Sequence, residues 1–424
     1  MIEIYPEISN GESYCPRCGA MGLNNDEVYF QGTHCLTSHT CADCSLEFYA
    51  TLGIGHAALF PVTFSCDGKY HQFNREEGSW MALPLIKSFQ NSPVEGPGIQ
   101  LLQPISGADL LLINCLDSCF GHVFTKIWNV YLLKKQFPDK TLAVLLPERC
   151  RWLISDKEVE IWSVTLSLED IGKGVQGLDF WVKQQFKRFR SVVLSTVPVH
   201  INQEQLDFSE ILQVKPFELE EFERLPVQLT FIWRSDRFWL NSKGLDLLHK
   251  TSIKFGFQNW VEFVMNYRQG RLLGRLFDKI RKAIPEAVFY VTGMGKKGKL
   301  PYGCQDERVE EMEESVERKW NEIYRRSHLV VGVHGSHMLI PTALAAGFVE
   351  ILPRYKLPHI TEDIGRHQPY RLSHFLGRFV DEFSTPNLVA EHVVSMLKGF
   401  GRVYENQKMG INKQFIKREF KNLN

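Results

Sequence analysis

Short apolar runs that alternate with helical patterns constrain the fold of this chain more than any other feature. Each run is shorter than a helix needs, and each is continuous, as in strands that are buried on both faces of a parallel sheet. Strand–helix–strand alternation predicts right-handed crossovers and doubly wound sheets. The expected strands are residues 110–116, 141–146, 159–166 and 191–195 in the first half, and 227–233, 287–292, 327–334 and 347–353 in the second.

The chain has 424 residues, which exceeds what one hydrophobic core usually spans. We therefore expect an α/β protein with two Rossmann-like doubly wound domains, at residues 61–215 and 216–424. A small cysteine-rich module at residues 1–60 precedes them. Residues 60–105 are rich in glycine and proline, so we expect irregular structure there, with a linker or surface loop at 91–98.

Composition excludes several classes of protein. Forty-nine basic and 49 acidic residues balance, which argues against a protein whose main task is to bind nucleic acid. No apolar run is long enough to span a membrane. The N-terminus has neither a basic start nor an apolar stretch, so it does not read as a secretory signal, and we expect a cytoplasmic protein.

Two Cys-x-x-Cys pairs define the N-terminal module. Cys15 and Cys18 form the first pair, and Cys41 and Cys44 form the second. Two such knuckles at this separation are typical of a zinc ribbon, in which two tight turns supply four thiolates at the corners of a tetrahedron. With four protein ligands the zinc would be structural.

Other interpretations of the cysteines stay open. The four thiols could be a reduced redox pair or unrelated, although a redox dithiol usually lies in a βαβ unit, and none is expected here. Cys35, His34 and His39 are further candidates that could replace one metal ligand.

Asp117 and His122 follow the first expected strand of the first domain. Ligands bind at the carboxyl ends of strands in doubly wound sheets, so these side chains are candidates for acid–base chemistry on a bound hydroxyl. The alternative is that Asp117 or Ser118 caps the following helix and that His122 is a surface residue.

Arg234 and Arg237 follow the first strand of the second domain. Guanidinium groups match phosphate oxygens, so two arginines at the end of a strand form a candidate anion site. The alternative is a solvated cluster in which Asp236 neutralises its neighbours.

The segment 327–353 gives the sharpest pattern in the chain. It reads as a buried strand, a turn at His334-Gly335, a helix of small residues and a second buried strand. Gly335 would let a backbone approach a ligand, and the amides of Ser336, His337 and Met338 would open a helix where a diphosphate binds.

These residues carry a resemblance to a known family. Phe-Ile-Trp-Arg234, Arg237 and Leu-Asn241, together with Val-Gly-Val-His334-Gly335 and Val-Glu350-Ile-Leu-Pro353, resemble motifs of glycosyltransferase family 61. The likeness covers residues 225–400. It implies a GT-B architecture, with two Rossmann-like domains that face each other across a cleft, and an inverting, metal-independent sugar transfer. After His-Gly the family has small residues, where this chain has Ser-His-Met-Leu-Ile.

The reaction that the resemblance implies suggests a role for each candidate residue, including Asp117 and His122, which lie outside the range of the likeness. Asp117, His122 and His334 would be catalytic, with Asp117 or His122 as the base. The donor, expected to be a UDP-sugar, would be bound by Arg234, Arg237, Asn241, Gly335, Ser336, His337, Met338 and Glu350. The acceptor would be a glycan, a lipid-linked molecule or a protein, and zinc would be the one metal, held at the cysteines.

Two alternatives to the transferase remain. One is a nucleotide-binding or nucleotide-sugar-binding protein without turnover. The other is a protein that associates with nucleic acid through the zinc ribbon. The basic residues between Lys408 and Lys421 give that alternative some support, although a solvated terminal helix or a weak contact with anionic lipid at the inner face of the membrane accounts for them better.

Overall fold

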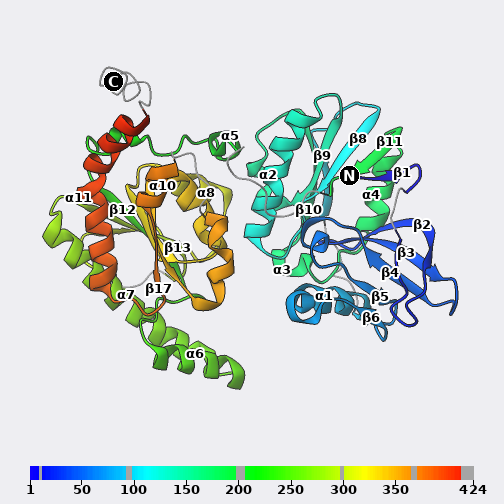
Figure 1. Ribbon diagram of the computed structural model, residues 1–424, viewed down its shortest axis with the longest axis horizontal. Coiled ribbons are helices and arrows are strands. Elements are labelled where there is room, and N and C mark those ends of the chain that lie inside the picture. The colour runs from blue at the N-terminus through cyan, green and yellow to red at the C-terminus, as the bar shows by residue number, and fades with distance from the viewer. Residues whose placement is uncertain (9–11, 92–97, 197–205, 297–299, 364–369, 412–424) are drawn as a thin grey trace, which may run out of the picture. The chain divides into compact units, whose positions relative to one another are not determined.

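The computed structural model describes residues 1–8, 12–91, 98–196, 206–296, 300–363 and 370–411. The chain divides into two compact units, Met1–Leu206 and Asp207–Asn424, each of which is described by itself. Each unit contains a largely parallel sheet with helices around it, as the alternation of strands and helices predicts (Figure 1). Within the described residues, no helix is both long and apolar enough to cross a membrane.

Unit 1 is built around a six-stranded sheet. Its strand order is β1, β11, β8, β9, β10 and β7, in which β8 to β11 are parallel and the two edge strands are antiparallel to their neighbours. The strands are β1 (Ile2–Tyr5), β7 (Gly98–Leu102), β8 (Asp109–Asn114), β9 (Thr141–Pro147), β10 (Val159–Thr165) and β11 (Ser191–Leu194). The helices are α2 (Phe120–Gln136), the 3-10 helix η2 (Glu148–Leu153), α3 (Leu168–Ile171) and α4 (Leu178–Phe186).

A second, antiparallel sheet lies in the same unit and contains the cysteine pairs. Its strands are β2 (Gly22–Phe30), β3 (Cys35–Cys41), β4 (Glu47–Thr51), β5 (Thr63–Ser65) and β6 (His71–Gln72), followed by α1 (Arg75–Gln90), with the 3-10 helix η1 (Gly55–Ala58) after β4. Val28, Phe30 and Cys35 share one hydrophobic cluster with Leu110 and Trp162 of the parallel sheet. The cysteine-bearing strands are therefore continuous with the core of unit 1.

The expectation of irregular structure over residues 60–105 was wrong. This stretch contains β5, β6, the 16-residue helix α1 and β7. The helix has a readable start, because the side chain of Asn74 accepts hydrogen bonds from the amides of Glu76 and Glu77. It also has Pro84 inside it, which removes a backbone donor and hides the helix from pattern recognition. Most of the linker expected at 91–98 lies outside the described residues.

Unit 2 contains a parallel six-stranded sheet of order β14, β13, β12, β15, β16 and β17. The strands are β12 (Gln228–Arg234), β13 (Val288–Met294), β14 (Cys304–Asp306), β15 (Leu329–Val333), β16 (Gly347–Leu352) and β17 (Gly377–Asp381). The sheet starts at β12, runs through β13 to β14 on one side, and resumes with β15 to β17 on the other. That is the strand order of a Rossmann fold.

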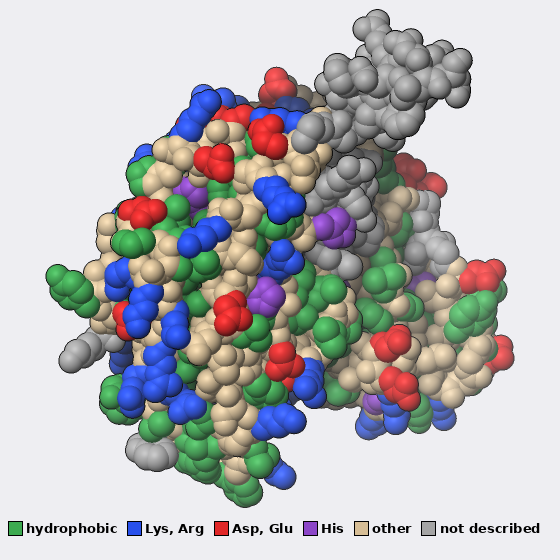
Figure 2. All heavy atoms as spheres, turned by 60° about the vertical axis from the view of Figure 1, so that its left-hand side comes forward, with side chains coloured by type: hydrophobic (Ala, Val, Ile, Leu, Met, Phe, Trp, Pro, Cys, Tyr) green, Lys and Arg blue, Asp and Glu red, His purple; other side chains and the backbone are tan. Residues whose placement is uncertain are grey.

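The helices of unit 2 follow the strands in the expected places, and α7 packs against α11. The helices are α5 (Phe208–Leu212), η4 (Leu219–Glu221), α6 (Lys243–Phe255), α7 (Gln258–Ala283), α8 (Glu314–Tyr324), η5 (Ser336–Met338), α9 (Leu339–Leu344), η6 (Arg354–Asp363), α10 (Tyr370–Leu376) and α11 (Pro386–Ile411). Basic side chains gather on the face of unit 2 that Figure 2 turns forward.

Candidate functional site

The strand order of unit 2 marks one place on its sheet for a ligand. β12 and β15 are neighbours, but the chain leaves them in opposite directions, so their carboxyl ends form the topological switch point of the sheet. A crevice at such a point is where open α/β sheets bind their ligands. Arg234 ends β12, and His334 and Gly335 directly follow β15. The structure therefore brings the arginine segment and the His-Gly turn together.

Arg237 lies directly against this turn. Its Nη1 donates a hydrogen bond to the carbonyl oxygen of His334, over 3.1 Å. A Cβ atom added at Gly335 would lie 1.6 Å from the same Nη1. Gly335 was expected to admit a ligand, but in this structure the space beside its Cα is filled by the Arg237 guanidinium. The glycine is thus required by the arginine that would bind the ligand.

Arg234 is already paired with an acid. Its Nε and Nη2 donate to the two carboxylate oxygens of Asp236, over 2.7 and 2.6 Å. Burial alone would raise the pKa of Asp236, but Arg234 outweighs burial and lowers this pKa to about 2. Asp236 is therefore ionised and offsets the charge of Arg234. The charge of Arg237 also lowers the pKa of Asp236, but among the described residues no carboxylate forms an ion pair with Arg237.

His337 adds a buried polar atom to the same place. Its ring lies beside Gly335, since Cε1 would be 3.3 Å from a Cβ there. The Nε2 atom is buried and has no hydrogen-bond partner within the described part of the chain. Burial, Arg234 and Arg237 together hold the pKa of His337 well below its usual value, so the ring is neutral. A buried ring nitrogen without a partner is costly unless a ligand supplies one.

His334 and Glu350 form a buried pair beneath the turn. Nδ1 of His334 lies 2.5 Å from Oε2 of Glu350, and both side chains are almost fully buried. The pairing of β15 with β16 fixes this contact, because Gly332 lies opposite Glu350 and the His334 amide donates to Ile351. Glu350 was expected to bind the donor directly; its carboxylate is instead turned toward the His334 ring and orients it.

The remaining residues that were expected to bind the donor are Met338, Ser336 and Asn241, and each has different contacts. The amide of Met338 donates to the carbonyl oxygen of Gly335, and its side chain is fully buried under Gly332. Met338 therefore stabilises the turn rather than offering a donor to a ligand. Ser336 is half-buried at the start of η5. Asn241 has a left-handed backbone, and its Oδ1 accepts from Nη2 of Arg268 on α7.

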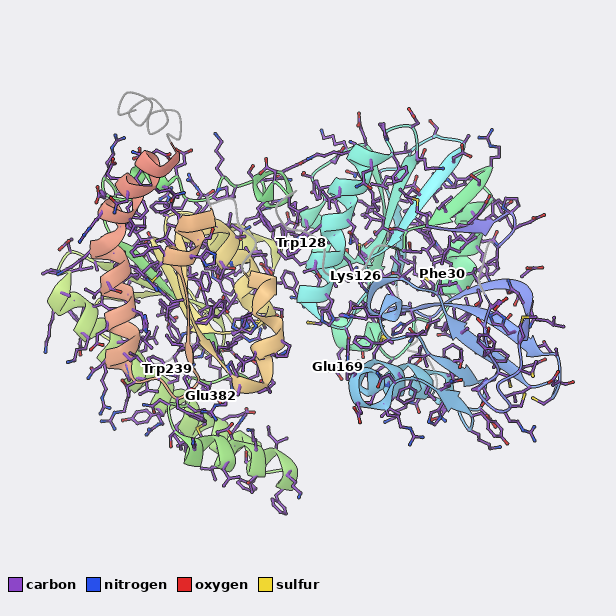
Figure 3. All side chains as sticks on the ribbon, in the orientation of Figure 1. Phe30, Lys126, Trp128, Glu169, Trp239 and Glu382 are labelled. Atoms are coloured by element: carbon purple, nitrogen blue, oxygen red, sulfur yellow. The ribbon has the colours of Figure 1, made fainter. Side chains whose placement is uncertain are left out.

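Residues of α7 that the sequence analysis did not single out shape the arginine segment. Gln269, almost fully buried, accepts from the amide of Trp239 and donates to the carbonyl oxygen of Arg234. Trp239, labelled in Figure 3, donates its indole N–H to the carbonyl oxygen of Ser384. The sequence contains a signal for the role of Gln269, because this polar residue lies on the same helix face as the buried residues Met265 and Leu272.

In unit 1, Asp117 and His122 lie in contact at the end of β8. Nδ1 of His122 is 3.0 Å from Oδ1 of Asp117, and Nζ of Lys126 is 2.8 Å from Oδ2. Burial would raise the pKa of Asp117, but Lys126 and His122 outweigh burial and hold this pKa far below its usual range. As a carboxylate Asp117 can only accept, so Nδ1 of His122 carries a proton in this contact.

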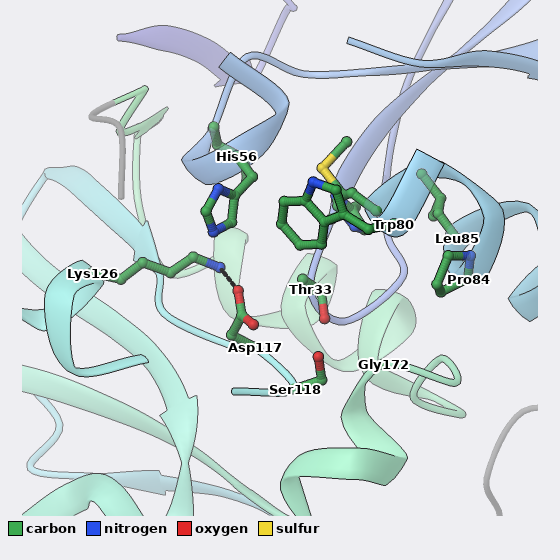
Figure 4. Close-up of a pocket in the computed structure, with 12 residues that line it drawn as sticks. Thr33, His56, Trp80, Pro84, Leu85, Asp117, Ser118, Lys126 and Gly172 are labelled. Atoms are coloured by element: carbon green, nitrogen blue, oxygen red, sulfur yellow. Dashed lines mark ion pairs between the residues drawn. The ribbon is translucent and has the colours of Figure 1, made fainter. Parts of the chain in front are cut away.

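Asp117 and Lys126, but not His122, line a small pocket of about 80 Å³, enough for a few water molecules or a hydroxyl group (Figure 4). Thr33 and His34 from the turn between β2 and β3, His56 from η1 and Trp80 from α1 form its other wall. The His56 ring lies 4.4 Å from the His122 ring and 4.9 Å from that of Trp80, centroid to centroid. The indole of Trp80 is half-exposed. His56 and Trp80 escaped the sequence analysis because α1 was not expected.

The four cysteines of the two pairs converge on one point. Their sulfur atoms all lie within 4.8 Å of one another, and the Cys18–Cys41, Cys18–Cys44 and Cys15–Cys44 separations are 3.4, 3.5 and 3.7 Å. A tetrahedron with zinc–sulfur bonds of about 2.3 Å has edges of about 3.8 Å. The amides of Arg17 and Cys44 point at cluster sulfurs, as in metal knuckles. The four residues therefore fit a metal ion.

The other candidate ligands lie elsewhere. Cys35 is buried in the core of unit 1 and its sulfur accepts from Nδ2 of Asn114. Nε2 of His39 hydrogen-bonds with the hydroxyl of Thr37. His34 borders the pocket near Asp117 and Lys126. None of these three belongs to the four-residue cluster that the structure describes.

Comparisons with known proteins give a likeness of structure only. No protein-family model matches the chain, and no curated protein sequence matches it.

Solved structures that resemble this chain include two heptosyltransferases from E. coli. ADP-heptose LPS heptosyltransferase II has a TM-score of 0.37 at 12% identity, over 70% of this chain and 100% of that one. Heptosyltransferase WaaC with ADP has a TM-score of 0.36 at 11% identity, over 68% and 100%.

The iron-containing dodecameric glycosyltransferase TibC from enterotoxigenic E. coli has a TM-score of 0.27 at 10% identity, over 71% of this chain and 77% of that one. These neighbours are glycosyltransferases. Scores and identities this low carry no argument about activity, so the function rests on the geometry of the site.

Proposed function

We propose that the chain is an inverting, metal-independent glycosyltransferase that takes a sugar from a nucleotide-sugar donor. One observation carries the proposal: the Arg237 guanidinium lies against the His334-Gly335 turn at the topological switch point of a Rossmann-type sheet. Among the described residues, a diphosphate at this point would meet an arginine that forms no ion pair and the buried Nε2 of His337, which lacks a hydrogen-bond partner.

The proposed reaction is a single displacement at the anomeric carbon. The acceptor oxygen forms a bond to this carbon while the bond from the carbon to the diphosphate oxygen breaks, and the diphosphate leaves with the electron pair. Arg237, Arg234 and His337 would meet the negative charge that develops on the leaving group. A fixed donor of this kind contributes about 2.7–4 kcal/mol to transition-state stabilisation. His334, oriented by Glu350, would hold the turn in place.

His122 is the proposed base, with Asp117 as a positioning residue. Asp117 is fixed as a carboxylate by Lys126, so it cannot readily take a proton from an acceptor hydroxyl. It keeps the proton of His122 on Nδ1, and Nε2 would then accept the proton of the hydroxyl. The neighbouring Trp80 indole offers an aromatic face to a sugar ring, which favours a glycan acceptor.

The finer identity of the donor and acceptor also belongs to this proposal. The motifs around Arg234, Arg237, His334 and Glu350 favour a relationship with glycosyltransferase family 61. They also favour a UDP-sugar donor. The residues of the site would contact the diphosphate, which all nucleoside diphosphate sugars share. The four-cysteine cluster would hold a structural zinc ion.

A product assay with a panel of nucleotide sugars tests the proposal. We expect Arg237→Ala to lower kcat/KM by about 100-fold or more with the competent donor, and Arg237→Lys to restore part of it. Arg402→Ala, which removes an exposed arginine of α11, is the matched control and should leave kcat/KM unchanged. Unchanged turnover in Arg237→Ala would remove this arginine from the site. Binding of the donor without any product would favour the nucleotide-sugar-binding protein instead.

A further inference from the structure

The helix pair α6–α7 exposes large apolar side chains in an unusual concentration. Phe255 and Phe263 are 70% and 73% exposed, and Leu247 is 66% exposed. We call this group the α6–α7 apolar patch, and it consists of Leu247, Ile253, Phe255, Phe257, Phe263 and Tyr267. Single exposed apolar residues need no explanation, but a group of this size on neighbouring helices indicates a surface that contacts a partner.

The exposed apolar residues of α6 do not all share one face, because Ile253 comes six residues after Leu247 and lies on another side of the helix. Leu247 and Phe255 lie on one face, since they are separated by eight residues, and Thr251 lies between them on the same face. Among the residues of α6 only Ser252 is fully buried, so only a small part of the helix surface packs against the rest of the unit. Figure 1 shows α6 extending away from the sheet of unit 2, and Figure 2 shows apolar and basic side chains at that end of the unit.

Basic side chains border the apolar face. Lys243, Lys250 and Lys254 follow one line along α6, next to the face of Leu247 and Phe255. Between residues 243 and 275 the chain has six basic residues and two acidic ones, although the whole chain is neutral. The basic residues are Lys243, Lys250, Lys254, Arg268, Arg271 and Arg275, and the acidic ones are Asp246 and Glu262.

Acidic groups nearby reduce this excess only in part. Asp246 pairs with Lys250 over 2.6 Å, and Glu382 also faces Lys250. No carboxylate pairs with Lys243 or Lys254 in the part of the chain that the structure describes. The excess of positive charge therefore persists around the apolar patch.

We infer that the α6–α7 apolar patch docks on an anionic lipid surface, with its phenylalanine and leucine side chains in the headgroup boundary and its lysines at the lipid phosphates. Exposed aromatic and leucine residues beside lysines are what an interfacial helix needs. A second copy of the chain is the poorer occupant, because a symmetric contact would bring the same positive charges together. This inference does not depend on the proposed enzymatic activity.

Vesicle flotation with the full chain tests the inference. We expect the chain to bind vesicles of phosphatidylcholine with 30% phosphatidylglycerol, not to bind pure phosphatidylcholine, and to lose binding as salt increases. Lys250→Gln and Lys254→Gln should each weaken binding about fivefold. Phe255→Ser and Phe263→Ser should each weaken it about tenfold or more.

Two controls keep the result specific to this patch. Phe180→Ser removes an exposed phenylalanine of unit 1 and should leave vesicle binding unchanged. A chain that ends at Ile411 lacks most of the basic residues of 408–421 and should still bind. Binding that survives Phe255→Ser and Phe263→Ser, or that is lost only in the shortened chain, would overturn the inference. So would the absence of binding to any vesicle, or self-association that the same substitutions abolish, which would identify a second copy as the occupant.

Discussion

Arg237 depends on the absence of a side chain at residue 335. Its guanidinium occupies the place where a Cβ of residue 335 would be, and it is held there by the carbonyl oxygen of His334. The atom that such a Cβ would meet is the end of a long side chain, which can rotate away, but the φ of Gly335, +155°, is itself a conformation that residues with a side chain rarely adopt. Arg237 and Gly335, which are about a hundred positions apart in sequence, are therefore coupled by a contact at the candidate ligand site. This contact is not part of the hydrophobic core.

Gly335→Ala should weaken both binding and stability. We expect the Kd for the donor to increase by about as much as in Arg237→Ala, because the methyl group displaces the guanidinium, and the midpoint of thermal unfolding to fall, because residue 335 has a φ of +155°, which residues with a side chain rarely adopt. Isothermal titration of both variants and of the double variant measures this. A double variant that is as weak as either single one supports the coupling, whereas additive losses would contradict it.

His34 makes a second prediction at the residue scale. Burial, with a further contribution from Lys126, lowers the pKa of this histidine to about 4. The unfolded chain then binds the proton first, so the stabilisation is complete above the unfolded pKa of 6.5 and is lost as pH falls toward 4. Between pH 7.5 and pH 5 this one residue should cost about 2 kcal/mol of unfolding free energy.

Urea unfolding at the two pH values measures this cost. The wild-type chain should lose about 2 kcal/mol more between pH 7.5 and pH 5 than His34→Gln does, since glutamine does not titrate. Gln72→Ala, which removes an exposed side chain of β6 that does not titrate, serves as the control, and its pH dependence should match that of the wild type. An equal loss in the wild type and in His34→Gln would mean that His34 does not titrate below its usual range.

At the scale of single elements, the strands could be predicted and some of the helices could not. The continuous apolar runs at 110–116, 141–146 and 227–233 correspond to β8, β9 and β12. Strands that are buried on both faces are apolar at every position, so such runs identify them in the sequence. Helix α1 was missed because Pro84 and Gly78 lie inside it, and only tertiary packing of residues such as Met81 and Leu85 compensates for them.

The candidate site, too, could be predicted from the sequence only in part. Arg234, Arg237 and Gly335 could be predicted to lie together, since each follows a buried strand and parallel strands end at one edge of the sheet. The contact between Arg237 and Gly335 could not, because it depends on the side-chain conformation. Gln269, His56 and Trp80 could not either, since their roles come from packing between elements that are distant in sequence.

The two cysteine turns make a prediction at the element scale. They close one end of the antiparallel sheet, where Cys15, Cys41 and Phe48 form a small core of their own. We expect one metal ion per chain by elemental analysis, which will also distinguish zinc from iron. Cys41→Ser should reduce the metal content to near zero and lower the unfolding free energy of unit 1, because metal binding contributes to folding in clusters this small.

Cys66→Ser is the matched control for the metal. Cys66 is an exposed cysteine of the same sheet, and it lies outside the cluster. Its substitution should leave one metal ion per chain. A metal content that does not respond to Cys41→Ser would show that the ion is bound elsewhere, and a wild-type chain without metal would remove the site.

At the scale of the whole molecule, each unit brings one part of the proposed reaction. Unit 2 has a Rossmann strand order and a cationic turn at its switch point, which suits a nucleoside diphosphate. In unit 1 a buried carboxylate orients a histidine and itself borders a small pocket, which suits an acceptor hydroxyl. The neutral total charge hides local differences, and the excess of basic residues on α6 and α7 is one of them.

The most direct test of this account is a crystal structure of the chain with a nucleoside diphosphate. We expect the diphosphate at the carboxyl ends of β12 and β15, with its oxygens within hydrogen-bond distance of the Arg237 guanidinium and of Nε2 of His337. A diphosphate bound at another place, or density that leaves the Arg237 and Gly335 turn without a ligand at saturating concentration, would contradict the account.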